Sequence, residues 1–232
     1  MHVALTEILR CPRCAAGLVL LTDRREGSRA IEGSLGCPQC EARYDVRAGV
    51  ADLRVPESSE TPSASASPDS SQPTAEDAVR LAALLGLESA RGVVLLIGSP
   101  ARSAEALAAL VPGVEVAIAR PERPAAEPAL AGPKPARPAA PRDTSSVLLT
   151  GDTLPLADRR LAAVAMDASA HVAIQEAARV LAPGRRVLVE GAGGRTRDDL
   201  EAAGCVIVAE GAGALVAERS GAPEPPRLYQ LA

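Results

Sequence analysis

Val93-Val-Leu-Leu-Ile-Gly98 is an uninterrupted apolar run that ends at a glycine. A strand that is covered on both faces needs such a run, because neither of its faces can carry polar side chains. Residues 103–110 then place Ala and Leu at helical spacing, and residues 114–118 form a second strand-like run. Strand, helix and strand in this order predict a parallel sheet with helices on both faces.

The same alternation continues on both sides of this unit. Upstream, Thr74-Ala-Glu-Asp77 places a hydroxyl cap three residues before an acid, which predicts a helix that ends near Gly86. Downstream, strands are expected at 147–150, 161–166 and 186–190, with a helix at 170–181 that Pro183-Gly184 stops. Two short runs at 205–209 and 214–218 are spaced for a C-terminal antiparallel hairpin. Residues 74–219 are therefore predicted to form a mostly parallel α/β domain.

Three low-complexity or polar stretches interrupt this order. Residues 56–73 are rich in Ser, Pro and Ala and cannot bury a core, so we expect a disordered linker. Residues 120–142 are rich in Pro and Ala, as in a surface loop, and residues 220–232 form a tail. The remaining segment, residues 1–55, is expected to be a separate module.

Two cysteine pairs dominate that module. Cys11-Pro-Arg-Cys14 and Cys37-Pro-Gln-Cys40 each let two thiolates face one ion, and two such knuckles complete a tetrahedral zinc site. Residues 17–21 and 30–35 can supply a hairpin between them. Because sulfur fills all four positions, the zinc is expected to be structural and to replace the core that so short a module lacks. The alternative is two redox pairs or free thiols.

The wider segment resembles the Trm112-like family of small zinc proteins. The resemblance rests on Leu5-Thr-Glu-Ile-Leu-Arg-Cys-Pro-Arg-Cys14 and on Cys37-Pro-Gln-Cys-Glu-Ala-Arg-Tyr44, and it covers about the first fifty-five residues. Members of this family typically bind and activate class I methyltransferases, often by extending the partner's sheet. The family's usual Pro after the Tyr is Asp45 here, and its Gly-Ile-Pro is Gly49-Val-Ala51.

The second domain is similar to class I S-adenosylmethionine-dependent methyltransferases, especially the type 11 group. The similarity rests on the run up to Gly98, on Gly151-Asp-Thr-Leu-Pro-Leu-Ala-Asp158 and on Arg179-Val-Leu-Ala-Pro-Gly184. It implies a Rossmann-like fold, and it implies that Gly98, Ser99 and Asp152 would contact the cofactor if S-adenosylmethionine binds. An acid that caps the turn at Gly151 explains Asp152 equally well. His171 lies where such enzymes often carry histidines, although a solvent-facing or helix-start histidine is the better explanation.

The cofactor loop departs from this pattern. The family's Gly-x-Gly-x-Gly lets backbone amides approach the methionine part of the cofactor. Here Pro100 and Arg102 replace the second and third glycines, Leu96 replaces the acid that ends the first strand, and Ala119 stands where an acid would bind the ribose. Binding of S-adenosylmethionine is therefore not expected, and no catalytic residue is assigned.

Composition narrows the functions further. A net charge of −4 and a pI near 5.4 give no basic field of the kind that nucleic-acid binders use. Neither a signal peptide nor a membrane-spanning apolar stretch is evident, so a cytoplasmic protein is expected. Cys205 is expected to be a small buried hydrophobe.

Three hypotheses follow. The first is a pseudo-methyltransferase, which acts as a scaffold or regulatory protein. Its zinc ribbon would bind a protein partner, which could be a methyltransferase, or would pair with its own sheet edge or self-associate. The second is an active methyltransferase in which Ser99, Arg102 and Asp152 replace the glycine loop. The third is a zinc-ribbon adaptor for nucleic acid or transcription machinery, which the charge balance and the scarcity of aromatic residues disfavour.

Overall fold

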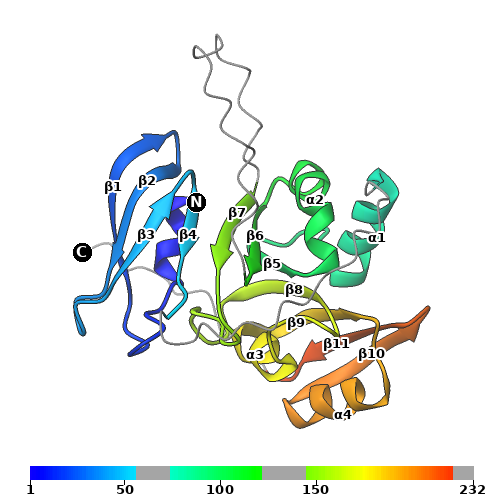
Figure 1. The fold of residues 1–232 in the computed structure, drawn as a ribbon. Helices are drawn as coiled ribbons and strands as arrows, with labels where there is room; N and C mark the ends of the chain where they lie inside the picture. The colour runs from blue at the N-terminus through cyan, green and yellow to red at the C-terminus, as the bar shows by residue number, and fades with distance from the viewer. Residues whose placement is uncertain (56–73, 122–144, 222–232) are drawn as a thin grey trace, which may run out of the picture.

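The computed structural model describes residues 1–55, 74–121 and 145–221. Its described strands form one eleven-stranded sheet in the order β1-β2-β3-β4-β7-β6-β5-β8-β9-β11-β10 (Figure 1). The predicted linker, most of the predicted Pro/Ala-rich loop and most of the tail lie outside the described residues. No helix within the described ranges is long and apolar enough to cross a bilayer.

The first four strands belong to the cysteine-bearing module, and each pairs antiparallel with the next. A short 3-10 helix, η1, precedes them. Their bounds are η1 Val3–Glu7, β1 Val19–Glu26, β2 Arg29–Gly36, β3 Arg43–Arg47 and β4 Val50–Asp52.

The strands of the second part form a mostly parallel array. The five strands β5 to β9 run parallel to one another. β11 lies between β9 and β10 and pairs antiparallel with both. The strands are β5 Gly92–Ile97, β6 Val114–Arg120, β7 Ser145–Leu149, β8 Leu161–Asp167, β9 Leu181–Glu190, β10 Cys205–Gly211 and β11 Ala214–Arg219. The helices are α1 Ala75–Leu85, η3 Ser99–Ser103, α2 Ala104–Leu110, α3 Ile174–Val180 and α4 Gly194–Ala202.

Alternating side chains of the central strands separate two cores. Val94 and Leu96 face the cluster beneath α1 and α2, whereas Leu95 and Ile97 face the cluster shared with α3, α4 and the ribbon. These strand residues are fully buried, as the continuous apolar run predicts. Helices thus cover both faces of the sheet, and the α/β expectation is confirmed.

The two modules share one sheet because β4 pairs in parallel with β7, Val50 opposite Val147 and Asp52 opposite Leu149. In Figure 1 the blue ribbon strands stand beside the edge of the green sheet. A polar cluster supports the same junction: Arg29 donates to Glu115 at 3.3 Å and to Ser146 at 3.2 Å, and the Ser146 hydroxyl donates to Glu115 at 2.7 Å. Pairing of the ribbon with its own chain is one of the arrangements that the sequence left open.

Local expectations fail at two places. The helix expected over 170–181 begins only at Ile174, and Leu181 already opens β9, because Ala173 keeps an extended backbone as the helix cap. The helix α4 was missed. Its N-cap is Gly193 in the segment Gly191-Ala-Gly-Gly194, and the Thr196 hydroxyl accepts a hydrogen bond from the Gly193 amide. A glycine-rich segment typical of a turn therefore also starts a helix.

Candidate functional site

The four paired cysteines lie on two turns of the same design. The Cys11 amide donates to the Ala16 carbonyl at 2.7 Å, and the Cys37 amide donates to the Ala42 carbonyl at 2.9 Å. Four residues after the first cysteine of each pair, Ala15 and Glu41 adopt left-handed conformations with φ of 59° and 57°. This tight reversal brings both sulfurs of each pair to one side of the turn.

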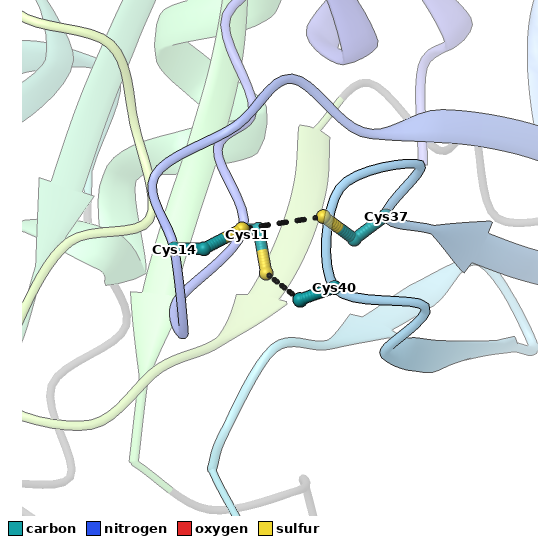
Figure 2. A group of neighbouring side chains, drawn as sticks. All are labelled: Cys11, Cys14, Cys37 and Cys40. Atoms are coloured by element: carbon teal, nitrogen blue, oxygen red, sulfur yellow. Dashed lines mark hydrogen bonds between the residues drawn. The ribbon is translucent and has the colours of Figure 1, made fainter.

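The two turns face each other and place the sulfurs together (Figure 2). All four lie within 4.8 Å of one another, with Cys11 Sγ 3.6 Å from Cys40 Sγ and Cys14 Sγ 3.4 Å from Cys37 Sγ. A zinc ion with four thiolates at about 2.3 Å sets neighbouring sulfurs about 3.8 Å apart. The donor set and its spacing fit one tetrahedral, sulfur-liganded ion.

Burial and hydrogen bonds shape the chemistry of these thiols. Burial raises the pKa of Cys11, but bonds from the Tyr44 hydroxyl and from the amides of Arg13 and Cys14 outweigh it, so the pKa falls to about 6. The Ala16 amide lowers the pKa of Cys14, yet the adjacent Cys37 sulfur raises it to about 12. Sulfurs this close cannot all ionise unless a cation replaces their protons.

Tyr44 contacts the cysteine cluster, and the sequence assigned it no role in the site. It lies on β3, is 6% exposed, and its hydroxyl is 3.3 Å from Cys11 Sγ. Such outer-shell donors orient metal ligands and tune their basicity. Its place in the family motif, four residues after Cys40, was the available signal.

The second candidate site lies at the carboxyl ends of the parallel strands, around Gly98. The Gly98 backbone has φ 73°, and a Cβ placed there would lie 1.8 Å from Asp167 Oδ2. The Ser99 amide donates to that same oxygen at 2.9 Å, and the Ser99 hydroxyl donates to Glu190 Oε2 at 3.0 Å. Two carboxylates therefore close over the loop in which a cofactor would meet backbone amides.

The rest of this loop is folded inward. Residues Ser99–Ser103 form η3, in which Pro100 and Ala101 are buried and Arg102 is exposed. Asp167 is held further by the Ser169 hydroxyl, which donates to Oδ1 at 2.7 Å. Asp167 and Glu190 escaped the sequence analysis, although each is the acid that ends an apolar strand.

Asp152 lies in the loop after β7, apart from Gly98 and Ser99. Since β6 separates β7 from β5, the ends of these strands are about 10 Å apart. Asp152 accepts a bond from the Thr153 hydroxyl at 3.3 Å, a contact within its own loop. The three predicted cofactor residues thus share one edge of the sheet, in two separate loops.

His171 lies at this edge and is half-buried. Its Nε2 is 3.0 Å from the Thr150 hydroxyl, and burial lowers its pKa although Asp152 and Asp167 raise it. The imidazole is therefore neutral near pH 7. Cys205 is buried at the start of β10, as expected of a small hydrophobe, and burial raises its pKa.

No family model and no curated protein match this chain. Similar solved structures include the antibiotic-resistance methyltransferase Kmr, with 16% identity and a TM-score of 0.39 over 66% of this chain and 95% of that one. A chain of the Haloferax volcanii complex between the Trm112 methyltransferase activator and a methyltransferase has 18% identity and a TM-score of 0.43, over 62% and 89%. A precorrin-6y C5,15-methyltransferase from Geobacter metallireducens has 15% identity and a TM-score of 0.39, over 62% and 88%. At such low identities and scores these likenesses carry no statement about activity.

Proposed function

We propose that this chain is a pseudo-methyltransferase, a cytoplasmic scaffold or regulatory protein in which a Trm112-like zinc ribbon is joined to a methyltransferase-like domain that does not use S-adenosylmethionine. The observation that carries the proposal is the bond between Asp167 and the Ser99 amide, directly over Gly98. The zinc is structural and is held by Cys11, Cys14, Cys37 and Cys40.

Electrostatics support the loss of the cofactor site. The methionine part of S-adenosylmethionine carries a carboxylate, and glycine loops receive it through free amides. Here the Ser99 amide is bonded to Asp167, and Glu190 adds a second negative charge 3.0 Å from the Ser99 hydroxyl. Pro100 has no amide hydrogen to offer. A carboxylate that approached this loop would meet two like charges in place of donors.

The expected loss of affinity follows from these groups. Each missing hydrogen bond to a charged group is worth about 1.5–3 kcal/mol, so two missing bonds remove at least about 3 kcal/mol. Because about 1.4 kcal/mol corresponds to a factor of ten, a loss of at least about 3 kcal/mol would weaken a site of about 1 μM at least about a hundredfold, to about 0.1 mM or weaker.

Calorimetric titration of the zinc-loaded full chain with S-adenosylmethionine tests this proposal. Saturation is not expected at cofactor concentrations up to about 0.1 mM, where a micromolar site would be almost fully occupied. Asp152→Ala is the matched variant, because Asp152 is the remaining acid that the methyltransferase resemblance assigns to the cofactor. A dissociation constant in the low micromolar range that Asp152→Ala abolishes would return the chain to the active methyltransferases.

The ribbon's pairing with β7 bears on the partner. A Trm112-like ribbon that extends a separate methyltransferase needs its sheet edge free, and here β4 is already paired in parallel with β7 of its own chain. We therefore propose that the ribbon completes its own domain, and that a protein partner binds elsewhere on the molecule. Size-exclusion chromatography with light scattering distinguishes a monomer from self-association through the ribbon.

A further inference from the structure

A short loop of the second domain, residues 154–157, is bonded to the ribbon along its main chain. The Arg10 amide donates to the Pro155 carbonyl at 2.9 Å, and the Ala157 amide donates to the Ile8 carbonyl at 2.8 Å. Between these bonds Leu9 and Leu156 form an antiparallel bridge, and both side chains are almost fully buried. This contact is separate from the pairing of β4 with β7.

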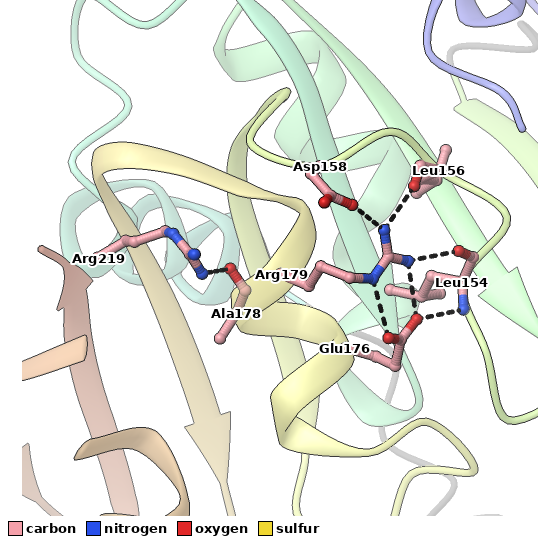
Figure 3. Close-up of polar contacts among 7 residues, drawn as sticks. All are labelled: Leu154, Leu156, Asp158, Glu176, Ala178, Arg179 and Arg219. Atoms are coloured by element: carbon pink, nitrogen blue, oxygen red, sulfur yellow. Dashed lines mark hydrogen bonds and ion pairs between the residues drawn. The ribbon is translucent and has the colours of Figure 1, made fainter. Parts of the chain in front are cut away.

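The opposite side of the loop is held by Arg179 of α3 (Figure 3). Its guanidinium donates to the Leu154 carbonyl at 2.8 Å and to the Leu156 carbonyl at 2.9 Å, and it also pairs with Glu176 and Asp158. Glu176 in turn accepts the Leu154 amide at 3.0 Å. One planar cation thus fixes two carbonyls of the loop, those of Leu154 and Leu156, which a point charge such as Lys cannot do.

The ribbon side of the contact is continuous with the metal site. Arg10 directly precedes the ligand Cys11, and Arg10 forms an antiparallel bridge with Gly17 on the far side of the first knuckle. The knuckle and the docking segment therefore share one backbone. Without a cation, the crowded sulfurs no longer hold the two knuckles together, and the segment 8–10 loses its fixed position.

We propose that zinc bound by the four cysteines orders loop 154–157 through residues 8–10, so that the ribbon acts as a metal-dependent clamp on the carboxyl edge of the sheet. This inference rests on the proposed zinc site. Arg179 is the positioning residue on the second domain.

Hydrogen exchange of the full chain, measured with zinc bound and after chelation, tests the clamp. Chelation is expected to speed exchange of the Leu154 and Ala157 amides about tenfold or more, within the range of typical site-to-site coupling. Peptides from β5 and β8 serve as internal references and are expected to keep their protection. Metal analysis on the same samples gives the zinc content.

Two variants complete the test. Arg179→Lys keeps the charge but loses the paired carbonyl bonds, so its loop is expected to exchange faster with zinc still bound. Because coupling between binding equilibria is reciprocal, this variant is also expected to bind zinc several-fold more weakly in competition with a chelator. Arg197→Lys is the control, since Arg197 pairs with Glu201 and Glu210 on α4 and β10, away from the loop.

The outcomes separate the two claims. If the protein binds one equivalent of zinc but chelation does not change the exchange of the loop amides, the clamp is overturned and the proposed zinc site is retained. Zinc well below one equivalent would overturn both. Equal zinc affinity of Arg179→Lys and Arg197→Lys would also overturn the clamp. Faster loop exchange and weaker zinc binding confined to Arg179→Lys would support it.

Discussion

Replacing Tyr44 by Phe isolates the contribution of one hydrogen bond to the metal site. The ring is 6% exposed and Phe fills the same space, so the packing of β3 against the ribbon core is kept. What is lost is the hydroxyl that lies 3.3 Å from Cys11 Sγ. The substitution therefore tests whether this donor stabilises the thiolate that holds the ion.

The size of the effect can be worked out from that geometry. A hydrogen bond to a charged group is worth about 1.5–3 kcal/mol, and removal of outer-shell partners weakens metal sites about 10–100-fold. A metal-bound thiolate has already given part of its charge to the ion, so the lower end applies. We expect zinc affinity to fall about tenfold, which corresponds to about 1.4 kcal/mol.

Competition between the protein and a chelating dye measures this change directly. Val19→Thr is the control, because Val19 lies on the same ribbon, is 54% exposed and has no part in the knuckles. Circular dichroism at saturating zinc verifies that both variants fold. If Tyr44→Phe binds zinc as tightly as the wild type while fully folded, the hydroxyl does not stabilise the thiolate and the reasoning is refuted.

Three further changes are predicted. Gly98→Ala places a Cβ 1.8 Å from Asp167 Oδ2 at a φ of 73°, so urea unfolding should show a loss of about 2–5 kcal/mol in the free energy of unfolding. In the control Gly211→Ala a Cβ meets nothing within 4 Å, so the free energy of unfolding should be nearly unchanged. Equal stability of the two variants would contradict the closed loop. Burial raises the pKa of Glu176, but Arg179 and the Leu154 amide lower it overall, so the stability that Glu176 contributes is present above pH 4.5 and is lost as the pH falls through the depressed folded pKa. In denaturant titrations, Glu176→Gln should therefore lose less unfolding free energy at acid pH than the wild type. An unchanged acid profile would be evidence against the ion pair. Leu9→Ala empties a fully buried position at the ribbon contact and should destabilise the chain by about 2–5 kcal/mol in thermal unfolding, whereas a change below about 1 kcal/mol would show that this contact is loose.

Several elements could be predicted from local sequence because their causes are local. The Thr74 and Asp77 pair forms the reciprocal cap that its spacing predicts, with the Asp77 amide 3.2 Å from the Thr74 hydroxyl oxygen and the Thr74 amide 2.8 Å from Asp77 Oδ2. The apolar runs from Val93 and from Val114 became central strands. The C-terminal runs paired antiparallel, with Cys205 opposite Arg219. Chain direction, side-chain period and capping chemistry all act within a few residues.

The cysteine cluster was also within reach of the sequence, since each knuckle brings its own two thiolates together and the segment between the pairs is long enough for a hairpin. Other features depended on partners that lie far along the chain. His171, in the stretch that stays outside the helix, contacts Thr150, and the Ser99 amide donates to Asp167, sixty-eight residues away. The joining of β4 to β7 links residue 50 to residue 147, and no local pattern specifies which free strand edge a ribbon will take. The sequence by itself determined which segments become strands, helices and ligand turns. Only the tertiary structure decided which edges pair and which charges close the loop after Gly98, because both are contacts between distant segments that form when the sheet assembles.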